Sequence, residues 1–473
     1  MKYARQQLFI AGKRHSTPET FLSVDPSCDR PLAEICKADK PTVHAAVEAG
    51  KRAFPSWSTT PPISRSRILL RAVALLRQRN DDLARIETHD TGKPFSETST
   101  VDIATGADVL EYYANLIASG GLNGETTYLR PDAWVYTTKA PLGVCAGIGA
   151  WNYPIQIALW KSAPCLAAGN CMVYKPSEFT PLHALQLAEL YAEAGLPPGV
   201  FNVVQGAGDV GALLTSHPGI AKVRQIPLPH PPRRRPRDRV DGAMMANFFS
   251  TGQVCTNGTR VFVPDTLLPA FEARLLAKMP HIRAGDLMDP ATNFGPLVSR
   301  VHRDKVLAYI RHGVETDGAR LLAGGPEAPP STPGVNPAGF WVRPTVFTNC
   351  TDGMRIVREE IFGPVMCLLP YSITRSTSYL DTLIARANDT TMGLAAGVFT
   401  KDLDLAHKVV ARLEAGITWV NTWGESPAEM AVGGWKMSGL GVENGRRGLE
   451  GWVRNKSTLV EMGGVVGTVF AKL

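Results

Sequence analysis

The sequence lacks several features that would place it in a special class of protein. No apolar run among its 473 residues approaches the ~20 residues of a membrane-spanning helix, so a helical membrane protein is excluded. The eight cysteines include no Cys-x-x-Cys pair, which argues against a zinc site or a disulfide framework and predicts a reduced, intracellular setting. The first residues, MKYARQQLFIAG, lack the apolar core of a signal peptide and are expected to belong to the mature protein.

The composition is that of an ordinary globular protein with two or more domains. Hydrophobic residues make up 44% of the chain and charged residues 20%. The net charge is +7, but six arginines and one aspartate lie in one stretch, residues 224–240, which reads RQIPLPHPPRRRPRDRV. The rest of the chain carries about +2 and has no other basic patch with interleaved aromatics, so we predict no nucleic-acid partner.

Helical and strand patterns alternate along most of the chain. Residues 63–88 repeat apolar side chains at helical spacing with charges on the other face, and 101–119 is a second helical stretch. Strands separated by helices are then expected at 141–151, 171–176, 200–206 and from 220. This alternation predicts a mostly parallel, doubly wound sheet. The pattern stops at 224, resumes with a helix from 241, and ends in two β-prone pieces, KSTLVEM and VVGTVF.

One glycine motif is a weak signal. GAGDVG at 206–211 matches the Gly-x-Gly-x-x-Gly dinucleotide fingerprint after a strand. That fingerprint needs an acidic residue about 20 positions later, where this chain has PHPPRRRPR. A glycine-rich turn that caps a helix explains the match better.

A stronger signal is spread over five motifs in a fixed order. They are GAWNYP (149–154), VYKPSE (173–178), GQVCTNGTR (252–260), EEIFGPV (359–365) and GGWKMSGLGVENG (433–445). Singly, each has an ordinary explanation: a lone cysteine is most often a small buried hydrophobe, and Asn152 could be a turn amide. Together they closely resemble the aldehyde dehydrogenase superfamily over residues 7–223 and 241–465. WNYPIQIALWKSAP and NTWGESPAEM resemble its betaine aldehyde dehydrogenase branch.

The resemblance implies a fold and a division into domains. We expect an α/β fold with a Rossmann-like, doubly wound cofactor domain over 1–125 and 141–242, truncated at 224–240. An α/β catalytic domain would cover 243–432. A small β oligomerisation arm would combine 126–140 with 455–473, which predicts a homodimer or homotetramer.

The resemblance also assigns roles to residues. Cys255 would attack the aldehyde carbon as a thiolate, and Asn152 with the backbone N–H of Cys255 would stabilise the oxyanion. Lys161 and Glu443 would form part of a proton relay. Cofactor contacts would come from Gly149, Ala150, Trp151, Lys175, Pro176, Ser177, Glu178, Glu360 and Phe362. Glu178 favours NAD over NADP, although NADP stays open because other phosphate determinants fall near the truncation.

Substrate and ion sites follow from the same resemblance. A quaternary ammonium is held best by aromatic faces, so Tyr153, Trp160 and Trp423 are expected to form a box for betaine aldehyde. The predicted reaction is oxidation of betaine aldehyde to glycine betaine. Potassium would bind at Ser23, Val24 and Asp90, and at Phe179, Lys436 and Gly439.

Residues 224–240 stand where the family carries two essential elements. These are a Ser-Phe-Thr-Gly turn that presents the cofactor pyrophosphate to a helix, and a strand with Glu-Leu-Gly-Gly-Lys, whose glutamate is the general base. Neither motif occurs in the chain. The run has five prolines, which exclude a helix or central strand, and Asp238 is its only acid.

Three explanations of the run compete. It is an error in the sequence or its splice junctions, a true feature of a catalytically crippled paralogue, or a docking segment. The third rests on the PxxPxR pattern, which polyproline-binding grooves recognise. The chain ends in Ala-Lys-Leu, close to a peroxisomal address, so the peroxisome is an alternative to the cytoplasm, where we expect the protein.

The first explanation has a direct test. Sequencing the transcript across codons 220–245 is expected to recover a longer coding segment with the glycine turn and the glutamate. A transcript that encodes RQIPLPHPPRRRPRDRV in frame would contradict the error and leave the other two explanations.

Overall fold

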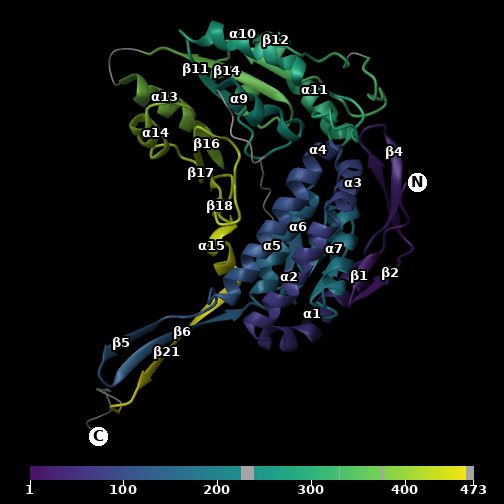
Figure 1. Cartoon of the computed structure of the whole chain (residues 1–473), viewed down its shortest axis with the longest axis vertical. Helices are drawn as coiled ribbons and strands as arrows, with labels where there is room; N and C mark the ends of the chain where they lie inside the picture. The colour runs from purple at the N-terminus through teal and green to yellow at the C-terminus, as the bar shows by residue number, and fades with distance from the viewer. Residues whose placement is uncertain (225–238, 330, 374–377, 465–473) are drawn as a thin grey trace.

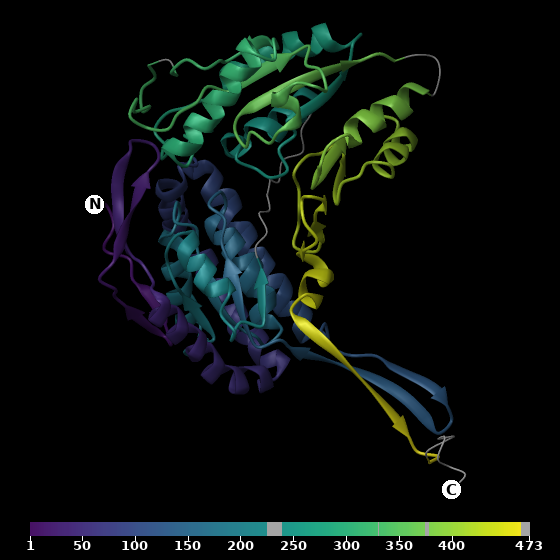
Figure 2. The same cartoon turned by 180° about the vertical axis from the view of Figure 1, so that it is seen from behind.

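The computed structural model describes residues 1–224, 239–329, 331–373 and 378–464 (Figure 1). It confirms the predicted mixed α/β fold, with two sheet-containing parts and a long β ribbon that projects from the body (Figures 1 and 2). No helix among these residues is long and apolar enough to cross a membrane. The Pro/Arg positions 225–238, VVGTVF and the C-terminal Ala-Lys-Leu lie outside the described residues.

The first sheet has six strands in the order β10-β7-β8-β9-β1-β2. β10, β7, β8 and β9 are parallel, and the β1–β2 hairpin is antiparallel. The strands are β1 (Leu8–Ile10), β2 (Lys13–His15), β7 (Val144–Ile148), β8 (Cys171–Lys175), β9 (Phe201–Val203) and β10 (Lys222–Arg224). Every residue of β7 and β8 is buried, as expected for parallel strands covered on both faces.

Helices pack against this sheet and against one another. α1 contacts β7, β8 and β9, α6 contacts β7 and β8, and α7 contacts β9 and β1, while α5 packs on α6. The helices are α1 (Lys40–Thr59), α2 (Pro62–Gln78), α3 (Asn80–Thr91), α4 (Phe95–Glu97), α5 (Ile103–Ala118), α6 (Pro154–Ala167), α7 (Leu182–Glu193) and α8 (Gly208–Thr215). A π-helical turn, η1 (Thr98–Asp102), leads into α5, and the hairpin β3 (Thr20–Asp25) with β4 (Arg30–Cys36) flanks α3.

The second part has a four-stranded sheet in the order β11-β14-β13-β12, with β12 antiparallel. Its elements are α9 (Arg239–Phe248), η2 (Phe249–Gly252), β11 (Arg260–Pro264), α10 (Leu268–Lys278), η3 (Met279–His281), α11 (Arg300–Glu315), β12 (Arg320–Ala323), β13 (Thr345–Thr348), α12 (Arg355–Arg358) and β14 (Val365–Tyr371). The chain then forms a separate parallel pair, β16 (Ala395–Val398) and β17 (Ile417–Val420), with α13 (Ser378–Asn388) and α14 (Leu403–Val410) beside it (Figure 1).

The C-terminal region returns to the first part. Short strands pair along this path: β15 (Met392–Gly393) with β19 (Trp435–Lys436), and β18 (Val432–Gly433) with β20 (Val442–Glu443), before α15 (Gly445–Glu450). The ribbon is a three-stranded antiparallel sheet of β5 (Thr126–Arg130), β6 (Ala133–Pro141) and β21 (Val453–Glu461). Its strands include the predicted KSTLVEM piece and most of the 126–140 segment.

Two expectations about helices need correction. The single pattern at 63–88 is divided into α2 and α3 at Arg79. Its charged face was expected to be solvent-exposed, but Glu87 is fully buried because it pairs with His183 at 2.8 Å and faces Lys93 at 3.8 Å. Opposite charges in the interior compensate one another, which a periodicity pattern cannot show.

Asn170 joins the base of the ribbon to the buried core. Its Oδ1 accepts the backbone N–H groups of Leu142, at 2.6 Å, and Gly143, at 3.0 Å. Its Nδ2 donates to the carbonyl oxygens of Cys165, at 3.3 Å, and Trp452, at 2.8 Å. One side chain thus satisfies backbone groups beside two strands at the base of the ribbon and at the end of α6.

Replacing Asn170 with alanine should therefore be costly. Four backbone groups lose a partner in a dry interior, and we expect the free energy of unfolding to fall by roughly 2–4 kcal/mol. Denaturant titration measures the change, and Asn455→Ala on the exposed face of β21 is the matched control, expected within about 0.5 kcal/mol of wild type. Equal effects of the two substitutions would contradict this role.

Candidate active site

A cavity of about 790 Å³ opens between the second sheet and the β16–β17 pair. Its wall includes residues from β11, α11, β16 and the β19 turn, so it is built where the two strand systems face each other. The predicted site residues on this wall are Trp151, Cys255, Glu360, Phe362, Trp423 and Lys436. The cavity thus gathers residues from four of the five sequence motifs.

The segment that carries Cys255 approaches the cavity through a strained turn. Ser250 (φ 49°) and Thr251 (φ 55°) both have left-handed backbone conformations, which cost a non-glycine residue about 1–3 kcal/mol each. Gly252 follows with φ 70°, and a Cβ there would lie 2.2 Å from the carbonyl oxygen of Gly363. Only glycine fits at that position, and the two residues before it must be held by other contacts.

Asn152 lies directly beside Cys255. Its Nδ2 donates to the carbonyl oxygen of Gln253 at 2.8 Å and lies 4.0 Å from Cys255 Sγ. Burial raises the pKa of the Cys255 thiol, and the charge of Glu360 raises it further, while the contact with Asn152 lowers it. The resting thiol is protonated at neutral pH, so a base must accept its proton before it can attack an electrophile.

Lys161 and Glu443 form a buried pair. Lys161 Nζ, on α6, lies 3.6 Å from Glu443 Oε1, on β20, and both side chains are almost completely inaccessible. The pair therefore joins the first part of the molecule to the C-terminal region. The structure brings together the two residues that the resemblance couples in a relay.

Aromatic rings line one side of the cavity. The ring centroid of Trp151 is 5.1 Å from that of His302 and 5.2 Å from that of Phe362. Phe362 itself has φ 61°, and its carbonyl oxygen accepts a hydrogen bond from His302 Nε2 at 2.7 Å. Lys305, one turn further along α11, lies 3.4 Å from the carbonyl oxygen of Glu360.

His302 and Lys305 were missed by the sequence analysis, although both line the cavity. They are three residues apart in a helix, so they lie on the same face. That spacing was the available signal, but no motif singled it out. Burial and, to a smaller extent, the charge of Lys305 lower the pKa of His302 to about 4 against the opposing effect of the hydrogen bond to Phe362, so the imidazole is neutral.

The remaining predicted cofactor residues cluster at the carboxyl ends of β7 and β8. Lys175 Nζ donates to the carbonyl oxygens of Pro176, at 2.6 Å, and Gly206, at 2.7 Å, and lies 3.8 Å from Glu178. Gly149 donates its N–H to the Lys175 carbonyl at 2.8 Å. Gly149, Ala150, Lys175, Pro176, Ser177 and Glu178 are therefore neighbours, at the sheet edge where dinucleotides bind in this fold class, but they do not line the cavity.

The three predicted box aromatics are not together on the cavity wall. Trp423 lines the cavity, with Trp419 at 5.2 Å, and donates Nε1 to the Thr256 carbonyl at 3.0 Å. Tyr153 and Trp160 are 0% and 1% exposed. Lys93 Nζ lies over the Tyr153 ring, 4.0 Å from its centroid.

The potassium predictions fall on two regions. Ser23 Oγ donates to Asp90 Oδ1 at 2.9 Å, so the first set lies together, and burial raises the pKa of Asp90 to about 7. Phe179 is an exposed residue after β8, whereas Lys436 lies in β19 and Gly439 in the turn that follows. Among the described residues, no cluster of three or more His, Cys, Asp or Glu side chains could hold a metal ion.

Comparison with models of protein families shows to which family the chain belongs. A model of the aldehyde dehydrogenase family matches residues 13–225 and 237–458. The chain belongs to the aldehyde dehydrogenase family. Residues 226–236, within the Pro/Arg run, are the internal stretch that the family model leaves unmatched.

Solved aldehyde dehydrogenases share the fold over nearly the whole chain. An indole-3-acetaldehyde dehydrogenase of P. syringae, in complex with NAD⁺, is 34% identical, with a TM-score of 0.89 over 96% of each chain. An NAD⁺ complex of a Bacillus cereus aldehyde dehydrogenase is 32% identical, with a TM-score of 0.89 over 97% of each chain. A Staphylococcus aureus betaine aldehyde dehydrogenase is 30% identical, with a TM-score of 0.90 over 98% of this chain and 99% of that one.

Because His302 is neutral in the folded protein, the free energy of unfolding should depend on pH. Its pKa is lower in the folded chain than the ~6.5 of an unfolded histidine, so the unfolded state binds more protons below pH 6.5. Stability is therefore fully present above pH 6.5 and falls as the pH drops towards 4, by at most about 3 kcal/mol. His302→Gln, which keeps a donor for Phe362, should lose less stability over this range in denaturant titrations at pH 4–7. Parallel curves for the two proteins would contradict the assignment.

Proposed function

We propose that this chain oxidises aldehydes through Cys255, with NAD as the hydride acceptor. The thiolate of Cys255 adds to the aldehyde carbon and forms a thiohemiacetal, whose C–H then gives up its hydride and leaves a thioester on the sulfur. The observation that carries the proposal is the placement of the Cys255 thiol and the Asn152 amide side by side at the cavity.

The oxyanion needs donors that are already in place. Asn152 Nδ2 is anchored on the Gln253 carbonyl and also faces Cys255 Sγ at 4.0 Å. We propose that this weak contact with the sulfur gives way to the oxygen of the bound substrate, which also receives the backbone N–H of Cys255. Loss of one such donor typically slows a reaction of this kind by ~10²–10³. The anchored amide therefore supports acyl transfer to sulfur as the chemistry of the site.

Protons leave the site by a route that we assign to Lys161 and Glu443. The pair is buried, and its atoms are close enough to exchange a proton over a short displacement.

The family's hydrolytic glutamate belongs to a Glu-Leu-Gly-Gly-Lys motif that this sequence does not contain. We therefore propose that the chain forms the thioester but hydrolyses it slowly, because a missing general base typically costs ~10²–10⁴ in rate.

Residues at both ends of a dinucleotide path suit NAD. Glu178 beside Lys175 offers a carboxylate and an ammonium to the hydroxyls of an adenosine ribose. Glu360 and Phe362 line the cavity wall with Cys255, which supports our assignment of these residues to the nicotinamide ribose and ring. The cofactor would accept the hydride, and the carboxylate at Glu178 disfavours a 2′-phosphate, which supports NAD over NADP.

Betaine aldehyde is the substrate we propose first. The exposed face of Trp423 on the cavity wall can attract a quaternary ammonium, a contact worth ~0.5–2 kcal/mol. With Tyr153 and Trp160 buried, Trp423 and Trp151 are the aromatic surfaces that support this choice. Indole-3-acetaldehyde is the neutral competitor to test beside it.

The β ribbon supports a homodimer or homotetramer as the working assembly. It exposes Tyr128 (81%), Leu129 (51%) and Leu459 (58%), which is more apolar surface than an isolated two-faced ribbon is expected to leave in water. We propose that these side chains are covered by a second copy of the chain.

We also propose that potassium binds at Ser23, Val24 and Asp90. A cation there would compensate the negative charge of the buried Asp90 carboxylate.

A single-turnover experiment tests the proposed function. Purified protein with NAD⁺ and betaine aldehyde should release about one reduced cofactor per chain, and intact-mass spectrometry should find one acyl group on Cys255. The steady rate after this burst should be lower by ~10²–10⁴. Cys255→Ala should give neither burst nor adduct.

Three results would contradict the proposal. No adduct and no reduced cofactor with either aldehyde would reject oxidation at Cys255. Steady turnover at the rate of the burst would reject the trapped thioester and show that another group activates water. A burst with indole-3-acetaldehyde alone would reject betaine aldehyde as the substrate.

A further inference from the structure

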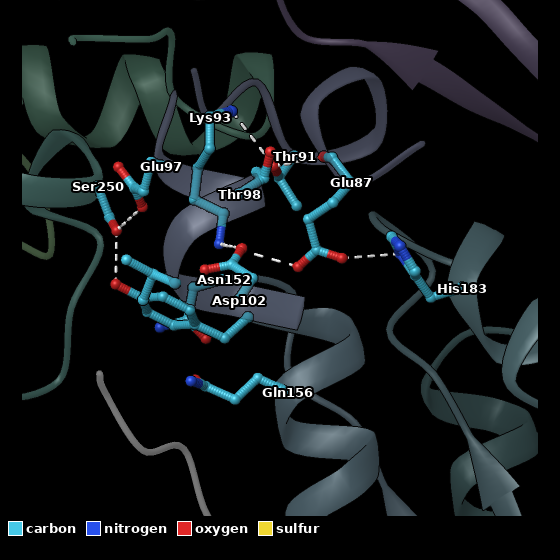
Figure 3. A network of polar contacts seen from close by, with 12 residues as sticks. Glu87, Thr91, Lys93, Glu97, Thr98, Asp102, Asn152, Gln156, His183 and Ser250 are labelled. Atoms are coloured by element: carbon cyan, nitrogen blue, oxygen red, sulfur yellow. Dashed lines mark hydrogen bonds and ion pairs between the residues drawn. The ribbon is translucent and has the colours of Figure 1, made fainter. Parts of the chain in front are cut away.

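A network of buried charged and polar side chains lies behind the turn that leads to Cys255 (Figure 3). Its members are Glu87, Lys93, Glu97, Asp102, His183 and Ser250, and all of them are at least nine-tenths buried. Lys93 pairs with Asp102 and with Glu87, and Glu87 pairs with His183. None of these residues lines the cavity, and neither the sequence motifs nor the proposed reaction gives them a role.

Glu97 connects this network to the strained turn. Its carboxylate accepts a hydrogen bond from Ser250 Oγ. Since the hydroxyl proton of Ser250 points to Glu97, Tyr153 must donate its own proton to Ser250 Oγ, at 2.5 Å. A directed chain of hydrogen bonds therefore runs from Tyr153 through Ser250 to Glu97.

The other two residues of the turn are held by different segments. Thr251 Oγ1 donates to the Gly295 carbonyl at 3.0 Å and lies 3.2 Å from the Gly295 backbone N. Gly252 rests on Gly363, where no Cβ fits. The Ser250 carbonyl oxygen accepts the backbone N–H of Gln253 at 3.0 Å and Gln253 Nε2 at 3.4 Å, both from within the same segment. Its side chain is tied to other segments by Glu97 and Tyr153, and we infer that these two contacts hold its left-handed conformation.

Tyr153 is fixed from a second direction. The Lys93 ammonium lies over its ring at 4.0 Å and is itself anchored by Asp102. Tyr153 directly follows Asn152, the residue beside Cys255 Sγ. Loss of the Tyr153–Ser250 contact would thus displace both the Asn152 amide and the segment that carries Cys255.

We propose that Glu97 is a positioning residue for the nucleophile: through Ser250 it holds the left-handed turn that keeps Cys255 buried beside Asn152. The inference rests on the proposed role of Cys255 in the reaction. Glu97 touches neither the cavity nor the reacting atoms, so its effect passes through the Ser250 hydroxyl.

Alkylation of Cys255 by iodoacetamide tests the proposal without aldehyde or cofactor. Burial is the main cause of the raised pKa of this thiol, so a relaxed turn should move the pH midpoint of alkylation down towards the ~8.5 of a free cysteine. For Glu97→Gln and for Ser250→Ala we expect a fall of at least one pH unit, which is about tenfold in rate at pH 8. Peptide mass spectrometry measures Cys255, and the partly exposed Cys28 provides an internal reference.

Two further variants separate positioning from general destabilisation. Glu87→Gln removes a carboxylate that is equally buried in the same network but does not contact Ser250, and its midpoint should match wild type. The double variant Glu97→Gln/Ser250→Ala should shift no further than either single change, because both break the same link. If Glu97→Gln does not fold, the alkylation midpoint of Ser250→Ala alone tests the proposal.

The proposal is overturned if Glu97→Gln and Ser250→Ala leave the midpoint at its wild-type value, or if Glu87→Gln shifts it equally. Additive shifts in the double variant would also overturn it. Because the alkylation needs no substrate, a failed burst with aldehyde would reject the proposed function and leave this result unaffected.

Discussion

A helix with no exposed side fixes the relative positions of most of the site. Every residue of α6, from Pro154 to Ala167, is buried, so its groups must be satisfied without water and the helix cannot shift without opening the core. The turn before it carries Asn152 to Cys255, its body brings Lys161 to Glu443, and the chain just beyond it reaches Asn170 at the base of the ribbon. The rigid helix α6 thus fixes the positions of three segments that are far apart in the sequence: the cysteine segment, β20 and the base of the ribbon.

The helices and strands could be predicted from the sequence, because the spacing of apolar residues and the glycines that end each element act over a few neighbouring residues. Apolar runs bounded by glycine located β7 and β8, and the motif order located Asn152 and Cys255. The sequence could not show which side of the α6 N-terminus Tyr153 would face. That choice is made by Lys93, which is 60 positions away in the chain and becomes a neighbour only after folding.

Charged residues were the main source of error for the same reason. A pattern assigns Glu87 to a solvated face and gives no role to Glu97, since isolated carboxylates rarely enter a protein interior. Here three buried carboxylates and two cationic side chains compensate one another, and they come from α3, α4, η1, α7 and the segment between α3 and α4. Such a cluster is expensive to disrupt from one side, because removal of a single partner leaves an uncompensated charge.

The short strand β10 has a consequence for the behaviour of the protein in concentrated solution. It pairs with β7 on one side, and no described strand pairs with its other side. A strand in that position offers a row of amide and carbonyl groups that another chain can add to, and Val223 is 38% exposed beside it. Strand addition at such an edge would limit the colloidal stability of the protein before any loss of the folded core.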